Sequence, residues 1–246
     1  MAEFILAVFA DVHANLEALH AVLADMDAHE ISQRVCLGDI VGYAANPAQC
    51  LKLVRQLDCP VVKGNHDEAA ATDASLDDMR EVAQRGIEFS RQKLSAEQRA
   101  YLATLPLTFS NEECQFAHAS LNDPSEWNYI LREADALEHF KAQNTLLSFC
   151  GHTHVPMVWH QSQAGKIKSW KGRGRIQLPM DGKTLINVGS VGQSRDLCTD
   201  ACYVMCDPKA HWVEFRRVAY NITRTRLKIV RAKLPPYAAQ RLSLGR

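Results

Sequence analysis

Apolar and amphipathic stretches alternate over the N-terminal part of the chain. Residues 3–10 form a mainly apolar run without alternation, which predicts a buried strand, and the apolar stripe after it predicts an amphipathic helix. "RVCLGD" predicts a second strand, "NPAQCLKLVRQL" a helix capped by Asn46, and "CPVVKGNHD" a third strand that runs into a loop. This order of strands and helices predicts βαβ units in a parallel sheet.

The rest of the chain divides into a helical part and a part with short strands. Residues 77–105 predict a helical insertion of two helices, the second of which starts at the capping box "SAEQ". "LPLTF", "CQFAH" and "TLLSFC" predict strands, "EADALEHFKAQ" a helix, and "NITRTRLKIVRAK" a C-terminal helix capped by Asn221. Residues 235–246 show no periodicity, so a loose tail is expected. We find no linker and expect a single α/β domain over residues 1–246.

Composition and charge narrow the range of partners. The chain of 246 residues is 47% hydrophobic and 23% charged with a formal net charge of zero, so no global field favours nucleic acid or an anionic membrane. The basic segment 166–175 is expected to be a solvated β-hairpin rather than a nucleic-acid contact. Asp11 interrupts the first apolar run too early for a signal peptide or a membrane span, which indicates a cytoplasmic protein. The eight cysteines form no compact framework and are expected to be reduced thiols.

Residues with metal-binding side chains follow the predicted strands. They are Asp11 and His13 after the first strand, Asp39 after the second, Asn65 and His66 after the third, His118 after "QFA", and His152 and His154 after "LLSFC". The carboxyl ends of strands in an open α/β sheet meet in one crevice, so these side chains are expected to converge. Carboxylate, amide and imidazole ligands without cysteine suit Mn²⁺, Fe or Zn²⁺. Their number exceeds what one ion needs, which favours a two-metal site bridged by Asp39.

As a set, "DVH", "GDIVG", "GNHD", "HAS" and "GHTH" resemble the motifs of the calcineurin-like metallophosphoesterases, from Asp11 to about Asp196. The resemblance implies a four-layer α/β/β/α sandwich of two mixed sheets with helices outside. It implies one ion held by Asp11, His13, Asp39 and His154 and another held by Asp39, Asn65, His118 and His152. The two histidines of "GHTH" would then serve different ions. The resemblance also implies that His66 is the proton donor to the leaving group.

Two departures place the chain within that superfamily. "GDIVGYAANP" lacks the Asp-Arg of the serine/threonine protein phosphatases, and Lys63 stands where they carry arginine, so protein-phosphatase activity is not expected. "NVGSVGQSRD" resembles the small prokaryotic phosphodiesterase-like branch instead. The resemblance implies that a metal-bridging hydroxide hydrolyses a small phosphodiester or phosphomonoester at two divalent ions. Mn²⁺ is the expected ion, with Fe, Ni or Zn²⁺ as alternatives.

Other functions and several residue roles stay open at this point. A dinucleoside polyphosphate hydrolase would use the same site with room for two bases, and a non-catalytic protein-binding scaffold would use the fold alone. A homo-oligomer is also left open. Asn65 and Arg195 are candidate substrate contacts, although Arg195 also has Asp196 as a candidate partner. Asp67 either orients His66 or caps the helix that follows it.

Overall fold

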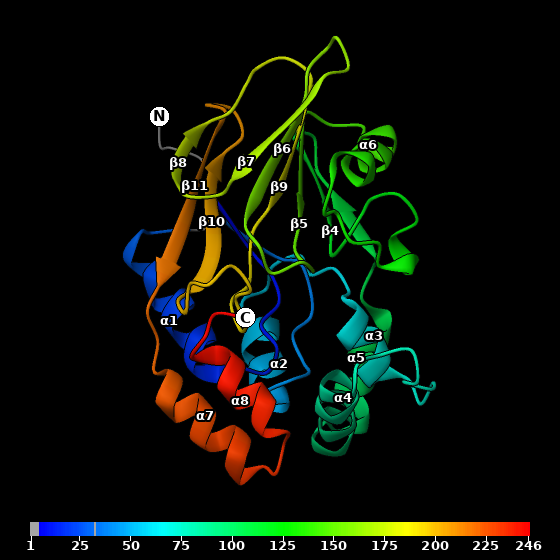
Figure 1. Ribbon diagram of the computed structural model, residues 1–246, viewed down its shortest axis with the longest axis vertical. Helices are drawn as coiled ribbons and strands as arrows, with labels where there is room; N and C mark the ends of the chain where they lie inside the picture. The colour runs from blue at the N-terminus through cyan, green and yellow to red at the C-terminus, as the bar shows by residue number, and fades with distance from the viewer. Residues whose placement is uncertain (1–4, 32) are drawn as a thin grey trace.

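The computed structural model, which describes residues 5–31 and 33–246, contains two mixed β-sheets that pack face to face (Figure 1). The first sheet has the order β2 (Gln33–Cys36), β1 (Leu6–Phe9), β10 (Ala201–Asp207), β11 (Trp212–Val218) and β8 (Gly174–Gln177). The second has the order β3 (Thr108–Ser110), β4 (Cys114–Ala117), β5 (Leu147–Cys150), β9 (Lys183–Asn187), β6 (Met157–Gln161) and β7 (Ile167–Lys171). Parallel pairs such as β1–β2 and β5–β9 stand beside antiparallel pairs such as β1–β10 and β9–β6.

Helices cover the outer faces of both sheets and the end where the parallel strands terminate (Figure 1). They are α1 (Leu16–Ala28), α2 (Pro47–Gln56), α3 (Asn65–Ala71), α4 (Glu81–Lys93), α5 (Ala96–Thr104), α6 (Glu133–Ala142), α7 (Ile222–Arg231) and α8 (Pro236–Leu242), with a 3₁₀ turn at Pro124–Glu126. Within the described residues, no helix is both long and apolar enough to span a membrane.

The burial of β1 explains the layers. Successive side chains of a strand point to opposite faces, so Ala7 and Phe9 join the core beneath α1 and α2, while Leu6 and Val8 join the core between the sheets. Both faces are therefore apolar, which is why the run lacks alternation. On the other outer face, α6 packs through Phe140 against the second sheet. This arrangement confirms the four-layer α/β/β/α sandwich of two mixed sheets.

The helix caps agree with the sequence in two of three cases. Ser95 Oγ accepts from the Gln98 N–H while Gln98 Oε1 accepts from the Ser95 N–H, as the capping box predicts. Asn221 caps α7 by accepting from the N–H of Arg224. Asn46 precedes α2, but its side chain accepts from Lys228 Nζ at 2.9 Å and makes no cap hydrogen bond.

Two expected strand features are wrong. The third strand shrinks to a single parallel bridge between Cys36 and Val61, in which the N–H of Val62 donates to the carbonyl of Cys36, because the chain turns into α3 at Asn65 directly afterwards. Residues 166–175 do not form a hairpin, because β7 pairs with β6 in one sheet and β8 pairs with β11 in the other. Residues 3 and 4 of the first expected strand lie outside the described residues.

Residues 235–246 are not a loose tail. Within them, α8 buries Ala238, Ala239 and Leu242 against Ile229 of α7 and the segment around Ala44. The carbonyl of Gly245 then accepts from the N–H of Leu197 at 2.9 Å. A helix this short, with alanines as half of its buried face, shows too little periodicity to be recognised in the sequence. The last segment of the chain is therefore fixed against the loops at the strand ends.

Candidate metal centre

The strand ends bring the predicted ligands to one end of the two sheets. Asp11 and His13 follow β1, Asp39 follows β2, His118 follows β4, His152 and His154 follow β5, and Asn65 and His66 begin α3. All except Asn65 are buried, with relative exposures of 5% or less. Segments far apart in the sequence therefore meet in one enclosed polar cluster, as the sequence predicts for a site at the strand ends.

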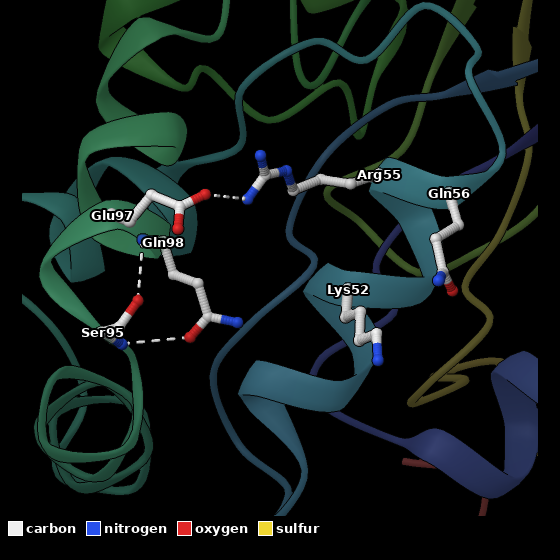
Figure 2. A pocket seen from close by; sticks show the side chains of 6 residues that line it. All are labelled: Lys52, Arg55, Gln56, Ser95, Glu97 and Gln98. Carbon is white, nitrogen blue, oxygen red and sulfur yellow. Dashed lines mark hydrogen bonds and ion pairs between the residues drawn. The ribbon is translucent and has the colours of Figure 1, made fainter.

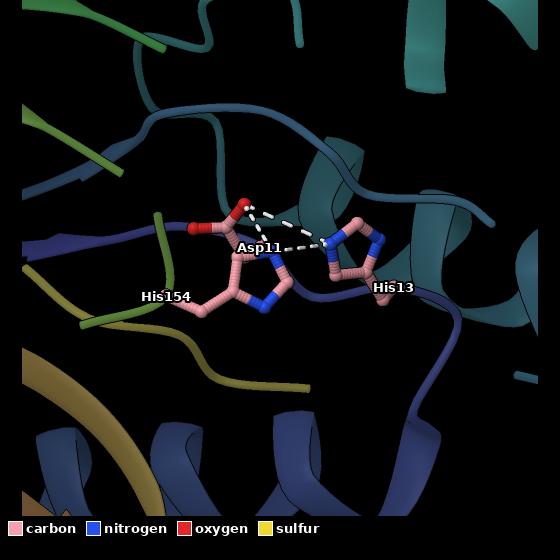
Figure 3. Close-up of side chains that lie close together, drawn as sticks. All are labelled: Asp11, His13 and His154. Atoms are coloured by element: carbon pink, nitrogen blue, oxygen red, sulfur yellow. Dashed lines mark hydrogen bonds and ion pairs between the residues drawn. The ribbon is translucent and has the colours of Figure 1, made fainter. Parts of the chain in front are cut away.

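The acidic and imidazole groups of this cluster form three overlapping sets. Asp11, His13 and His154 form one set, shown in Figure 3, and Asp39, His118 and His152 form another. A third set joins His13 and Asp39 to His66. In each set the candidate ligand atoms all lie within 4.8 Å of one another. His152 and His154 thus lie in different sets, which is the arrangement that the family resemblance implies.

Asp39 lies between the two main sets. Its Oδ1 accepts from the backbone N–H of His66 at 2.8 Å, which holds the carboxylate in place. Its Oδ2 lies 3.6 Å from His13 Nε2 and 3.4 Å from His118 Nε2. One carboxylate oxygen therefore faces imidazoles of both sets, which is the position that a bridging ligand needs.

Asp11 is held in a similar way. Its Oδ2 accepts from the backbone N–H of His152 at 3.0 Å. Its Oδ1 lies 3.3 Å from His154 Nε2 and has no hydrogen-bond partner although it is fully buried. One oxygen thus anchors the side chain while the other points into the cluster.

Backbone carbonyls orient three of the imidazoles. The Nδ1 of His13 lies 3.1 Å from the carbonyl of Val41, and the Nδ1 of His118 lies 2.8 Å from that of Leu37. His154 Nδ1 lies 2.5 Å from the carbonyl of Gln193. A carbonyl can only accept, so each Nδ1 carries a proton and each Nε2 is turned toward the cluster. Metal-bound histidines are usually oriented by this kind of outer hydrogen bond.

The backbone around the cluster is strained. Asp11, His13, Asp39, His152 and His154 have positive φ values of 56°, 47°, 51°, 65° and 60°. Residues other than glycine rarely adopt this region, and each instance costs on the order of 1 kcal/mol or more. Strain concentrated on the candidate ligands supports a function for their exact orientation, since a purely structural turn would use glycine or asparagine.

The ionisation states suit a cation. Burial acts to raise the pKa of Asp11 and of Asp39, but the imidazoles of His154 and His118 lower these pKa values below the usual range. Burial lowers the pKa of His152 to about 3. Burial also acts to lower the pKa of His118, but the carboxylate of Asp39 outweighs it and raises that pKa to about 9. Ionised carboxylates and a neutral imidazole are the forms that bind metal, and His118 would release a proton on binding.

Unpartnered acceptor atoms show that the residues present fit metal ions. Among the described residues, Asp11 Oδ1, Asn65 Oδ1, His66 Nδ1 and His152 Nε2 are buried in this cluster without a hydrogen-bond partner. Leaving a buried polar atom unpaired costs about 1–3 kcal/mol, and four in one cluster are unusual. Cations bound between them would satisfy the oxygen of Asn65 together with the carboxylates and imidazoles.

Asp67 caps a helix and does not orient His66. Its Oδ1 accepts from the N–H groups of Ile40 and Val41 at 2.9 and 3.3 Å, and its Oδ2 accepts from the N–H of Gly64 at 3.2 Å. The carboxylate therefore ties the start of α3 to the loop that carries Asp39. The Nδ1 of His66 has no acidic partner there.

Arg195 lies beside this cluster and does not pair with Asp196. Its Nη2 donates to Tyr43 Oη at 3.4 Å, and its Nε is buried without a partner. Asp196 forms an ion pair with Arg217 instead. The ring of Tyr43 lies 4.7 Å from the rings of both His13 and His66. Arg195 therefore contacts Tyr43, and Tyr43 in turn contacts His13 and His66 of the cluster.

Two aromatic residues at the cluster were missed in the sequence. The ring of Tyr129 stacks on that of His152 with centroids 3.9 Å apart. The rings of Trp127 and His118 are in a T-shaped contact with centroids 6.0 Å apart. Both belong to the loop after the 3₁₀ turn, where Trp127 has a φ of 53°. No periodic signal marks this loop, since its contacts depend on the tertiary fold.

Asn187 holds one of the loops of the cluster in place. Its Nδ2 donates to the carbonyl of Gly151 at 2.6 Å and to Thr153 Oγ1 at 3.0 Å, while its Oδ1 accepts from the N–H of Gly189. The side chain therefore ties "GHTH" to the end of β9 and fixes the loop that carries His152 and His154.

A separate surface hollow of about 540 Å³ lies between α2 and α5 (Figure 2). Its lining residues are Lys52, Arg55, Gln56, Ser95, Glu97 and Gln98. An ion pair of 3.0 Å between Arg55 and Glu97 crosses it. None of the lining residues belongs to the cluster, and the hollow contains the capping box of α5 rather than a set of converging unpaired groups.

Comparison with known sequences gives long matches. The family model described as the calcineurin-like phosphoesterase superfamily domain matches residues 4–210. An uncharacterized protein from Methanocaldococcus jannaschii is 38% identical over 250 residues, covering 100% of both chains.

Solved structures agree with these matches. A metallophosphoesterase from Sphaerobacter thermophilus is 36% identical with a TM-score of 0.87, and the match covers 99% of this chain and 100% of that one. A hypothetical protein from Pyrococcus horikoshii OT3 is 20% identical with a TM-score of 0.80, covering 98% of each chain. The second likeness shows the same fold.

Proposed function

Because this chain belongs to the calcineurin-like phosphoesterase superfamily and is a metallophosphoesterase, we propose that it hydrolyses a small phosphodiester or phosphomonoester at two divalent metal ions. One observation carries the proposal. Two ionised carboxylates and five imidazoles converge in a buried cluster, and Asp39 faces imidazoles of both main sets through a single oxygen.

The proposed ligands divide between two ions. Asp11, His13, Asp39 and His154 would hold one ion, and Asp39, Asn65, His118 and His152 would hold the other. When bound, such a pair of ions would activate a water molecule and neutralise phosphate oxygens. Mn²⁺ is the ion that we expect, with Fe, Ni or Zn²⁺ as alternatives that the same ligands accept. The cytoplasmic location expected from the sequence stays a prediction.

His66 is the proposed proton donor to the leaving group. It is buried beside Asp39, and burial lowers its pKa to about 4, so the free protein holds it neutral at neutral pH. A bound phosphate would place negative charge next to the imidazole and stabilise its protonated form. A donor is needed because an alkoxide leaving group is a strong base.

The first test compares hydrolysis of bis-p-nitrophenyl phosphate and p-nitrophenyl phosphate with and without Mn²⁺. The Asp39→Asn variant should lose more than about a hundredfold in turnover, since it removes the bridging carboxylate. Asp58→Asn is the matched control, because Asp58 is exposed and has a φ of 49°, close to the 51° of Asp39. Equal loss in both variants, or turnover without any divalent ion, would contradict the proposal. The faster substrate indicates a diester or a monoester preference.

A second test isolates His66. The His66→Ala variant should still bind Mn²⁺ but lose about 10²-fold or more in turnover of phenyl phosphate, whose leaving group is poor. Turnover of p-nitrophenyl phosphate should fall much less, because p-nitrophenolate leaves without a proton. An equal fall in turnover of both substrates would contradict the role of His66 as proton donor.

The aromatic residues at the cluster favour a second candidate, a dinucleoside polyphosphate hydrolase. Tyr129 is 48% exposed while its ring stacks on His152, so one face of the ring is available to a base. Hydrolysis of diadenosine tetraphosphate faster than bis-p-nitrophenyl phosphate, and lost selectively in Tyr129→Leu, would establish this candidate. The scaffold alternative has no comparable support, since every predicted ligand and His66 are in place.

A further inference from the structure

The docked C-terminal segment brings a second arginine to the rim of the cluster. Arg241 lies on α8 and is 8% exposed. Its Nε donates to the carbonyl of Arg246 at 2.8 Å, and its guanidinium carbon lies 5.9 Å from the centroid of the Tyr43 ring. Tyr43 also contacts Arg195, so both guanidinium groups lie near one phenol.

The charges of the two arginines are not balanced by acidic side chains in the described part of the chain. Over residues 5–31 and 33–246, no aspartate or glutamate lies within 4.0 Å of the guanidinium of Arg195 or Arg241. Burial and the charge of Arg195 both lower the pKa of Arg241. Holding a cation in a buried or partly buried place without an acidic partner is costly, and placing a second cation near it adds repulsion. An arrangement of this kind is stabilised when an anion binds between the two groups.

Tyr43 connects this pair to the proposed centre. Its ring contacts those of His13 and His66 on one side, while its hydroxyl accepts from Arg195 on the other. Planar guanidinium groups match the oxygens of a phosphate with paired hydrogen bonds. A phosphate held by the pair would therefore be separated from the cluster by no more than the side chain of Tyr43.

We propose that Arg195 and Arg241 form an anion subsite that binds a second phosphate group of the substrate. This proposal rests on the proposed phosphoesterase function and narrows its substrate class. The substrate carries two phosphates in close succession, as in a nucleoside diphosphate or a longer polyphosphate. The phosphate at the cluster is the one attacked, and the phosphate at the subsite positions it.

The test compares two ligands, one of which carries one more phosphorus group than the other. Calorimetric titration of the full chain with MnCl₂ present measures binding of AMP and of adenosine 5′-(α,β-methylene)diphosphate, which is not hydrolysed at its bridge. The wild type should prefer the diphosphate analogue by about tenfold or more. Arg241→Gln should remove most of this preference, and Arg241→Lys should restore only part of it because lysine keeps the charge but not the fork.

Controls separate this subsite from general charge and from folding. Arg226→Gln makes the same charge change at an exposed position of α7 and should keep the preference. If Arg241→Gln unfolds, Arg195→Gln and Tyr43→Phe test the same pair with smaller changes to the core. A wild type without the preference, or folded Arg241→Gln and Arg195→Gln variants that keep it, would overturn the proposal. Binding does not depend on turnover, so failure of the wild type to hydrolyse p-nitrophenyl phosphate would count against the proposed function alone.

Discussion

The Nε2 atoms of His13 and His154 face each other at 3.1 Å across the cluster. Each ring donates its Nδ1 proton to a backbone carbonyl, so both facing atoms carry lone pairs. Such a contact is repulsive without a proton or a cation between the two nitrogens. The folded chain therefore holds these rings in an arrangement that a bound cation would stabilise.

Metal removal should lower thermal stability. A divalent ion at a hundred times its dissociation constant stabilises the folded state by about 2.7 kcal/mol, which for a chain of this size corresponds to roughly 5–10 °C in Tm. Calorimetric scans with Mn²⁺ and with a chelator should show this difference in the wild type and in Asp58→Asn. Asp39→Asn should show little of it. Equal Tm values for the wild type under both conditions would contradict a metal centre.

Replacement of Gly42 should disable His66 without removing the ions. Gly42 has a φ of 93°, and a Cβ there would lie 2.3 Å from His66 Nδ1. Gly42→Ala should therefore displace the imidazole and lower turnover of phenyl phosphate by about tenfold or more, with Mn²⁺ binding retained. Gly165 has a φ of 81°, and a Cβ added there would meet nothing within 4 Å, so Gly165→Ala carries a similar strain and should keep full turnover. Equal activities in the two variants would show that His66 tolerates displacement.

The Asp67→Asn variant should be less stable and should bind Mn²⁺ more weakly. The carboxylate accepts from three backbone N–H groups, and an amide would turn an N–H₂ group toward at least one of these donors. The loss should be about 1–3 kcal/mol in the free energy of unfolding, measured by urea denaturation. The exposed Asp78 gives the control variant Asp78→Asn, for which no change is expected. Identical unfolding midpoints for both variants would contradict the structural role of Asp67.

His139 should make stability depend on pH. Its Nδ1 accepts from the N–H of Leu121 at 3.1 Å, and its Nε2 donates to Ser148 Oγ at 2.9 Å, so the neutral ring satisfies both contacts. Burial lowers its pKa to about 3, below the value of about 6.5 in an unfolded chain. The stability contributed by this depressed pKa is present above pH 6.5 and is lost as the pH falls toward 3.

The magnitude of this effect can be measured against a variant. Between pH 7 and pH 5, His139 should account for a loss of about 2 kcal/mol in the free energy of unfolding. Urea titrations should show this loss in the wild type and in His20→Gln, which changes an exposed histidine, and a flatter profile in His139→Gln. The same slope in all three proteins would exclude His139 as the source.

The sequence predicts the fold and the cluster because each depends on a local signal. Buried strands such as β1 are continuous apolar runs, and the candidate ligands follow them at once, as Asp11 and His13 do. The ends of these strands lie at the same edge of the fold, so residues that directly follow the strands come together in one site.

The parts that the sequence does not predict depend on contacts between distant segments. Arg241 lies on a helix of seven residues whose place is set by packing against Ala44 and Ile229, and no local pattern records that packing. Tyr129 reaches His152 from an irregular loop. The strands β7 and β8 have the spacing of a hairpin, and only their separate partners, β6 and β11, place them in different sheets. Local propensity cannot distinguish such cases.

The central position of β1 has a consequence during synthesis of the chain. Its neighbours are β2, which follows within the next thirty residues or so, and β10, whose first residue is Ala201. One edge of this fully buried apolar strand therefore stays unpaired on the ribosome until most of the chain has been made. At about 5–20 residues per second, translation leaves this edge exposed for roughly ten seconds or more. Nascent chains should therefore be most prone to aggregation and chaperone binding before β10 emerges.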